Sequence, residues 1–334
     1  MAPPTLTSVV PNTGPAAGTN PVTLNGTQFT GATAVTFGSA AALSYTVTSP
    51  SAITATVPPG TGTVNVTVRT PAGLSNTVSY TYAPTPTLSS IAPSQGPTAG
   101  GTTVVLTGTG LTGTTAVTFG STPATSFTVN SATQITAVTP AGTGAVPVTA
   151  TTVGGTSGAV FFYYLNAPSL ASVAPSQGPA SGGTTVVLTG SGLTGTTAVT
   201  FGSTPATSFT VNSATQITAV SPAGTGAVPV TVTGPGGTSN TVIYTYLSAP
   251  ALTALSPAQG PTDAGASVTL TGTALTTTHA VHFGAAPAAF TVVSDTTVVA
   301  IAPAGPAGSV PVTATTSGGT SNSLSYLRVA APAI

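Results

Sequence analysis

Apolar and polar residues alternate over short segments of the chain, and the same alternation recurs several times along it. Val104 and Leu106 fall on one face of the segment 102–107, and Val117 and Phe119 follow the same rule a turn later. A period of two residues is typical of β-strands with one buried face. No segment of useful length shows the helical period. The chain is therefore predicted to be all-β.

Four further strands complete one repeat unit. The glycine-containing segment 108–110 is expected to end the first strand, and a Pro-Ala-Gly turn at 140–142 lies between two later ones. The closing strand places Val160, Phe162 and Tyr164 on one face. The four additional strands are predicted at residues 126–129, 134–138, 145–149 and 159–164.

Two proline positions recur in the repeats and carry a structural prediction each. Pro147 lies inside a predicted strand, and since proline has no N–H to donate, this strand is expected to be an edge strand or to contain a bulge. The motif Pro-x-x-Gly-Pro at 93–97 predicts a sharp turn, with the glycine supplying a positive φ.

The repeat has a fixed length of 82 residues, as the spacing of Phe37, Phe119, Phe201 and Phe283 shows. Units of this size with many short strands are typical of immunoglobulin-like β-sandwiches. The linkers are a few residues long and end in proline, which restricts the preceding residue, so we expect an elongated, semi-rigid rod. The predicted domains are residues 1–83, 84–165, 166–247 and 248–334.

Charge is almost absent from the 334 residues: there are two Lys plus Arg, two Asp plus Glu, and two His. Phosphate recognition needs clustered cations, so a nucleic-acid partner is excluded. A net charge near zero removes self-repulsion and favours self-association into filaments. The absence of cysteine excludes disulfides and thiolate metal sites. The N-terminal residues lack the pattern of a signal peptide, and no apolar window approaches a membrane span.

The ionisable side chains gather in the last repeat and are the candidates for a metal site: Asp263, His279, His282 and Asp295. Two His and two Asp could ligate a metal, but the three-residue spacing of the histidines sends their side chains to opposite faces of an extended strand. No nucleophile–base pair recurs, and the two carboxylates fall in predicted loops. The prediction is no catalytic residue, no metal and no cofactor.

A different role is considered for the charged residues at the two ends of the chain. The middle two repeats carry no charge, whereas Arg69 lies in the first repeat and Asp263 and Asp295 in the fourth. If chains associate end to end, Arg69 of one copy could meet Asp263 or Asp295 of the next. The alternative is that these are unpaired surface positions. The tyrosines of the closing strands are assigned to the core, which leaves no aromatic platform for a carbohydrate.

The repeat unit resembles the IPT/TIG family of immunoglobulin-like domains. The resemblance covers essentially the whole chain in four copies, and its motifs are structural, so they imply the fold and leave the function open. The DNA-binding members use basic loop residues that are missing here. The motifs of the second copy are Ile91 to Pro97, Gly100-Gly101-Thr102, Leu106 to Leu111, Val117 to Gly120, Val146 to Thr149 and Gly154 to Ser157.

The resemblance and the composition together predict a non-enzymatic structural protein, an extracellular or cell-surface spacer, stalk or fibre subunit. The first alternative is an adhesion module that binds a surface glycan or a protein through its loops. Near-duplication of the middle repeats favours spacing or avidity over four distinct specificities. The second alternative, a component of a phage tail or related virion particle, would account for the lack of a signal peptide.

Overall fold

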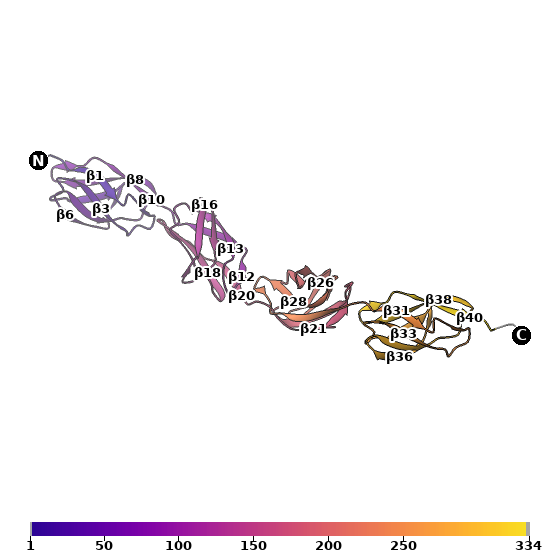
Figure 1. The fold of residues 1–334 in the computed structure, drawn as a ribbon. Helices are drawn as coiled ribbons and strands as arrows, with labels where there is room; N and C mark the ends of the chain where they lie inside the picture. Colours follow the sequence, from indigo (N-terminus) through magenta and orange to yellow (C-terminus); the bar gives the residue numbers. More distant parts are fainter. Residues whose placement is uncertain (1, 332–334) are drawn as a thin grey trace. The chain divides into compact units, whose positions relative to one another are not determined.

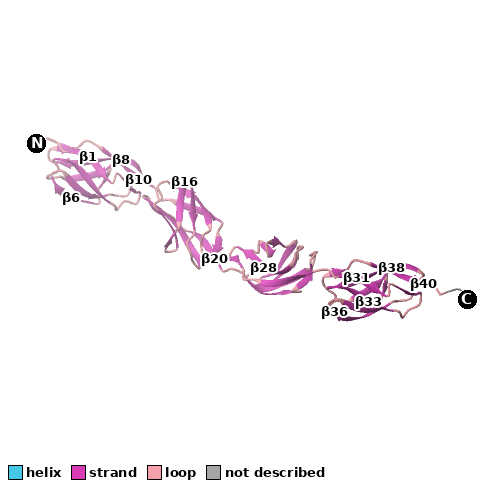
Figure 2. Cartoon of the chain, in the orientation of Figure 1, coloured by secondary structure: helices cyan, strands magenta, loops and turns pink. Residues whose placement is uncertain are grey.

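The computed structural model describes residues 2–331 and contains strands, turns and loops but no helix over this range (Figures 1 and 2). The strands form four sandwiches of two sheets each, and the predicted all-β fold with four immunoglobulin-like units is confirmed. No helix suited to crossing a membrane occurs among the residues that the structure describes.

Each repeat contributes ten strands, several of them only two or three residues long. The strands of the first repeat are β1 (Thr5–Val10), β2 (Thr13–Pro15), β3 (Pro21–Thr27), β4 (Ala34–Phe37), β5 (Ala40–Ala41), β6 (Ser44–Ser49), β7 (Ala52–Thr56), β8 (Gly62–Thr70), β9 (Gly73–Leu74) and β10 (Val78–Ala83). Those of the second repeat are β11 (Thr87–Ala92), β12 (Gln95–Pro97), β13 (Thr103–Thr109), β14 (Ala116–Phe119), β15 (Thr122–Pro123), β16 (Ser126–Ser131), β17 (Gln134–Val138), β18 (Gly144–Thr152), β19 (Gly155–Thr156) and β20 (Val160–Leu165).

The third and fourth repeats have the same strands in the same order. The strands of the third repeat are β21 (Ser169–Ala174), β22 (Gln177–Pro179), β23 (Thr185–Ser191), β24 (Ala198–Phe201), β25 (Thr204–Pro205), β26 (Ser208–Ser213), β27 (Gln216–Val220), β28 (Gly226–Gly234), β29 (Gly237–Thr238) and β30 (Val242–Leu247). Those of the fourth are β31 (Ala251–Ser256), β32 (Gln259–Pro261), β33 (Ser267–Thr273), β34 (Ala280–Phe283), β35 (Ala286–Pro287), β36 (Ala289–Ser294), β37 (Thr297–Ile301), β38 (Gly308–Thr316), β39 (Gly319–Thr320) and β40 (Leu324–Val329).

The sheets of the second repeat represent all four. One sheet has the order β11-β13-β17-β16, and the other has the order β12-β20-β18-β14-β15 with β19 paired to β18. The segment that opens the repeat changes sheets: β11 pairs antiparallel with β13, and after the cis peptide bond Ala92–Pro93 the chain continues as β12, parallel to β20. The second and the last strands of the repeat thus meet in one sheet.

Each repeat has its own hydrophobic core between its two sheets, as the period-two pattern predicts. Val104, Leu106 and Val117 are at most 1% exposed in the second repeat, and Phe119 and Phe162 pack edge to face with ring centroids 5.7 Å apart. Separate clusters of buried residues fill the first, third and fourth repeats. A repeat therefore satisfies its main apolar burial by itself.

Pro147 does not lie in an edge strand, contrary to the prediction. β18 is paired on one side with β20 and on the other with β14, and the register beside Pro147 is regular. The N–H and C=O of a strand residue point to the same side, and the Pro147 carbonyl accepts a hydrogen bond from Gly120 N–H (2.7 Å), just past the end of β14. The missing N–H therefore faces the place where the β14 ladder has ended.

The Pro-x-x-Gly-Pro motif is only partly a turn. Its last residues, Gln95 to Pro97, form β12, and Gly96 does not have a positive φ. A side chain at Gly96 would overlap the Thr102 hydroxyl, because an added Cβ would lie 2.3 Å from it. The glycine is thus required by close packing, where the prediction had invoked backbone conformation. β13 also runs one residue past Gly108, so the predicted break begins at Gly110.

An asparagine joins the two ends of the repeat in three of the four copies. Asn76 accepts a hydrogen bond from Leu6 N–H (2.9 Å) through Oδ1 and donates one to Leu6 C=O (2.8 Å) through Nδ2. Asn240 and Asn322 make the same pair of bonds to Leu170 and Leu252. Gly158 occupies this position in the second repeat, which therefore lacks the brace.

Candidate functional site

The four metal-site candidates of the fourth repeat occupy separate surface positions. Asp263 is exposed in the bend between β32 and β33, and Asp295 is exposed in the turn between β36 and β37. Asp295 Oδ1 accepts a hydrogen bond from the Thr276 hydroxyl (2.8 Å). His279 is exposed just before β34, and among residues 2–331 no group of three or more His, Cys, Asp and Glu side chains is placed to hold a metal ion.

His282 replaces a threonine that is paired across strands in the other repeats. Thr118 and Thr149 share a hydrogen bond between their hydroxyls (2.9 Å), and equivalent pairs occur in the first and third repeats. His282 lies on β34, half-buried and opposite Thr313 of β38. The substitution is accommodated at a polar cross-strand position on the outward face of the sheet.

Arg69 and the two aspartates occupy positions that bear on the end-to-end contact. Arg69 is exposed on β8, one residue before Thr70. Asp263 follows β32, whose Pro261 pairs with Val329 where the chain leaves the fourth repeat. Asp295 instead lines a small cavity with Leu247 and Ser248, where the chain enters that repeat. Of the two, only Asp263 lies at the outgoing end, and its contact with Arg69 of another copy stays a prediction.

Arg328 is the charged residue whose position the sequence analysis did not foresee. It is only 4% exposed and takes the inward place that Tyr82, Tyr164 and Tyr246 hold in the other closing strands. Its Nη2 donates to the Pro303 carbonyl (2.9 Å), as the Tyr164 hydroxyl donates to the Pro140 carbonyl (2.8 Å). The Nε atom is buried without a partner. The period-two spacing from Leu324 was the available signal for this inward position.

The guanidinium group of Arg328 lies against Gly305, as the tyrosine rings lie against the glycine of the same turn in other repeats. A Cβ at Gly142 would be 2.5 Å from the Tyr164 ring, and one at Gly305 would be 2.3 Å from Nη1 of Arg328. A flat group is therefore accommodated at this position in every repeat. The arginine is a structural substitution for tyrosine, and its buried charge has no carboxylate partner in the described chain.

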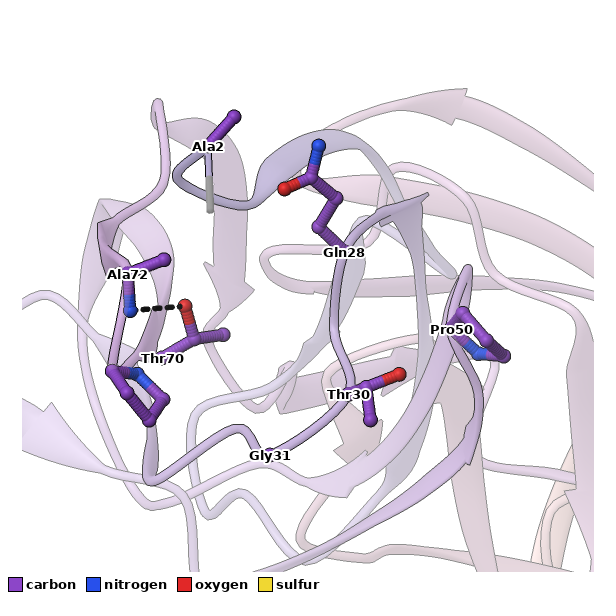
Figure 3. A pocket seen from close by; sticks show the side chains of 8 residues that line it. Ala2, Gln28, Thr30, Gly31, Pro50, Thr70 and Ala72 are labelled. Atoms are coloured by element: carbon purple, nitrogen blue, oxygen red, sulfur yellow. Dashed lines mark hydrogen bonds between the residues drawn. The ribbon is translucent and has the colours of Figure 1, made fainter.

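A cavity of about 740 Å³ lies at the loop end of the first repeat (Figure 3). Gln28, Thr30 and Gly31 border it on one side, and Thr70 and Ala72 on another, with a hydrogen bond from Ala72 N–H to the Thr70 hydroxyl (3.3 Å). Ala2, Pro50 and Pro71 also line it. The described side chains of this lining are neutral, and none of them is a carboxylate, a histidine or a cysteine.

The equivalent cavity of the fourth repeat shows which part of the chain packs at this place. This cavity has a volume of about 170 Å³ and is lined in part by Leu247 and Ser248, the segment that enters the repeat. Ala2 stands at the equivalent of Ser248 in the first repeat. The larger cavity thus corresponds to the place where an entering chain segment packs, and it needs no small-molecule ligand to account for it.

Two aromatic side chains on β20 face outward: Phe161, for which no position was predicted, and Tyr163, which was predicted in the core with the other tyrosines of the closing strands. Phe161 is 52% exposed and Tyr163 is 49% exposed, and both alternate with the buried Phe162 and Tyr164. Phe161 pairs with Pro147 of β18, and Tyr163 pairs with Ala145. The signal was present in the sequence, since a strand with aromatic residues at four consecutive positions must turn two of them outward.

Comparisons with known proteins identify the repeat. The sequence model of the IPT/TIG domain matches residues 4–82, 86–164, 168–246 and 250–327. No match is found among individual curated protein sequences.

Several solved structures are similar to the chain at low identity. The extracellular region of plexin A4 matches with 17% identity and a TM-score of 0.37, covering 94% of this chain and 36% of the plexin chain. Invasin, a bacterial integrin-binding protein, matches with 17% identity and a TM-score of 0.31, covering 98% of this chain and 79% of invasin.

The protein SGBP-B of a mixed-linkage glucan utilization locus in Bacteroides ovatus matches with 16% identity and a TM-score of 0.23. This match covers 73% of the present chain and 70% of SGBP-B. The chain spans less than half the length of either plexin structure that it matches, 36% of one and 48% of the other. The match to the domain model, four times in succession and over nearly the whole sequence, shows that the chain belongs to the IPT/TIG domain family.

Proposed function

We propose that the chain is a non-enzymatic structural repeat protein that acts as an extracellular spacer, stalk or fibre subunit. The observation that carries this proposal is that the residues joining the first and second repeats contact one repeat or the other. Ala83 C=O accepts a hydrogen bond from Ala16 N–H (2.9 Å), which attaches the residue to the first repeat. The next residue, Pro84, has its carbonyl oxygen so close to Gly154 of the second repeat that an added Cβ would lie 2.1 Å away.

Ala83 and Pro84 are adjacent in the chain, and the first is held by the first repeat while the second packs against the second repeat. The same arrangement occurs before the fourth repeat, where Leu247 C=O accepts from Ala180 N–H (2.9 Å) and Ser248 C=O lies against Gly318. A linker that has contacts at every residue loses the freedom of a flexible chain. This favours a role in which the distance between two attached elements matters.

The non-enzymatic part of the proposal is supported by the side-chain chemistry. The fourth repeat holds the two carboxylates and both histidines, and these lie apart in the positions described above. The cavity of the first repeat is bordered by neutral side chains. Near-zero net charge supports self-association of the same chain, the fibre form of the proposal.

The test measures the distance distribution between two repeats. The chain has no cysteine, so Thr46→Cys and Thr128→Cys, exposed at equivalent places on β6 and β16, provide two unique sites for spin labels. We expect a narrow distribution by pulsed electron paramagnetic resonance. Gly154→Ala should broaden it because the new methyl group displaces Pro84, whereas Gly158→Ala, with open space around the Cβ position, should not. A broad distribution in the unaltered chain would contradict the spacer proposal.

A further inference from the structure

Phe161 and Tyr163 form an exposed aromatic pair on the outward face of β20 in the second repeat. Residues two apart on a strand lie on the same face, roughly 7 Å apart, so the two side chains leave the strand on the same side. They expose 52% and 49% of their surface, respectively. Neither belongs to the core cluster of the repeat or packs against it. Two half-exposed aromatic side chains therefore lie on the same outward face and outside the core of the repeat.

The third repeat shows that this pair is not needed for folding. Its closing strand β30 has the same register with β28 and the same inward residue positions, but Ile243 and Thr245 replace the two outward aromatics. The two repeats are almost identical from Pro93 and Pro175 to the middle of β18 and β28. Aromatic residues at both outward positions are thus a local feature of the second repeat, added to an unchanged fold.

The surroundings of the pair are flat, neutral and rich in hydrogen-bonding groups. Residues opposite each other on adjacent strands share a face, which places Pro147 and Ala145 on one side and Gln95 of β12 on the other, all exposed. The threonine hydroxyl pair at Thr149 lies one step further along β18. The second repeat, residues 84–165, contains no Lys, Arg, Asp, Glu or His.

We propose that the Phe161–Tyr163 face of the second repeat binds a neutral carbohydrate chain, with the pyranose rings stacked on the two aromatic side chains. Aromatic rings present a flat apolar surface with a negative face, which matches the C–H groups on one side of a sugar ring. The Gln95 amide and the Tyr163 hydroxyl can donate to and accept from sugar hydroxyls at the edge of the stack. The complete lack of charge in the repeat selects against anionic polysaccharides and nucleic acids.

This site goes beyond the spacer function and does not depend on it. It lies on a sheet face, whereas Gly154 and Gly318, in loops of the second and fourth repeats, pack against Pro84 and Ser248 of the entering chain. A single two-ring site predicts weak binding, which becomes useful when several copies act together on one polysaccharide. The second repeat would thus carry the carbohydrate site, and the other three repeats would act as spacers.

The experiment is affinity chromatography of the intact chain on columns that carry an immobilised polysaccharide, because a chain with a net charge near zero would barely move in a native gel. The probes are a β-glucan, a galactomannan, an arabinoxylan and pullulan, with alginate as the anionic control. We expect retarded elution with at least one neutral probe and no retardation with alginate. The variant Phe161→Ile with Tyr163→Thr installs the residues of the third repeat and should weaken binding about tenfold or more.

A matched gain-of-function variant tests the same idea in the opposite direction. Ile243→Phe with Thr245→Tyr places a second aromatic pair on β30 and should strengthen retardation by the same probe. Unretarded elution of the parent chain with every neutral probe would overturn the proposal, and so would equal retardation of the parent and the Phe161→Ile, Tyr163→Thr variant. Sedimentation velocity of the parent and of the Phe161→Ile, Tyr163→Thr variant tests whether a second copy of the chain covers this face instead. If the parent forms a dimer that the variant does not form, and neither binds carbohydrate, the proposal is also overturned.

Discussion

The missing asparagine of the second repeat provides the sharpest test of how the sandwich is held together. Gly158 stands where Asn76, Asn240 and Asn322 bridge the last and first strands of their repeats. Its Cβ position is open, without a protein atom within 4 Å, and its φ is not in the left-handed region. The preceding Ser157 makes the same hydrogen bonds as Ser75 does in the first repeat. Gly158→Asn should therefore restore the brace.

The expected gain comes from two sources. Two neutral hydrogen bonds to the Leu88 backbone contribute about 1–3 kcal/mol together. Replacing a glycine whose backbone is compatible with other residues adds roughly 0.4–1 kcal/mol by reducing the freedom of the unfolded chain. Leu88 is only half-buried, whereas Leu6, Leu170 and Leu252 are at most 3% exposed, which agrees with a looser β11 in the second repeat.

Hydrogen exchange with peptide-resolved mass spectrometry separates the second repeat from the third, because their opening strands differ in sequence. The amides of residues 87–92 should exchange about tenfold to hundredfold more slowly in Gly158→Asn than in the parent. The reverse change, Asn240→Gly, should accelerate exchange of residues 169–174 by a similar factor. Gly158→Ala is the control, since it removes the glycine without adding the amide.

Exchange that is equally slow in Gly158→Ala and Gly158→Asn would show that backbone entropy accounts for the effect. Faster exchange in Gly158→Asn would refute the structural reasoning, because the asparagine would then disturb a backbone that differs from that of the first repeat. Only slower exchange specific to the asparagine supports the brace.

Three further predictions concern the closing strands. Tyr164→Phe should lower the free energy of unfolding of its repeat by about 1 kcal/mol, since the hydroxyl donates to the Pro140 carbonyl. Tyr246→Phe should leave the stability of its repeat unchanged or raise it, because that hydroxyl is buried without a partner. Denaturant titrations of the two variants compare the effects. Arg328→Tyr should stabilise the fourth repeat by roughly 1–3 kcal/mol, since it removes a buried charge with an unpaired Nε, and a fall in its melting temperature would contradict this. Burial raises the pKa of five tyrosines of the closing strands above 10.0: Tyr80, Tyr82, Tyr164, Tyr246 and Tyr326. The folded chain therefore keeps these protons to higher pH than the unfolded chain, and its stability should fall as pH rises beyond 10. Alkaline denaturation followed by circular dichroism tests this.

The sequence was sufficient to predict the strands and their buried faces, because one buried side imposes alternation directly. β17 has the predicted bounds, 134–138, and Val117 and Phe119 of β14 are buried as expected. Alternation does not state which strands are neighbours, and this is why Pro147 was predicted to lie in an edge strand or at a bulge. The order of the sheet decides that its N–H would point beyond the end of β14.

The candidate site was predicted less well than the fold, because residue type was given more weight than position. No role was predicted for Arg328, although its place in the period-two pattern of the strand is inward. Aromatic character made the tyrosines of the closing strands look like core residues, although Tyr163 alternates with Tyr164 and lies outside. The His and Asp residues drew attention by their rarity, and their separation depends on loop positions that the sequence pattern does not encode.

The parallel pairing of β2 with β10 has a mechanical consequence for a chain pulled at its two ends. Tension enters a repeat through β1, which continues into β2, and leaves through β10. β2 and β10 meet at Thr13 with Thr81, Gly14 with Tyr82 and Pro15 with Ala83. Because the strands are parallel, such a force slides one past the other and loads these contacts together instead of opening them one after another. Each repeat thus resists stretching at the parallel strand pair that corresponds to β2 and β10.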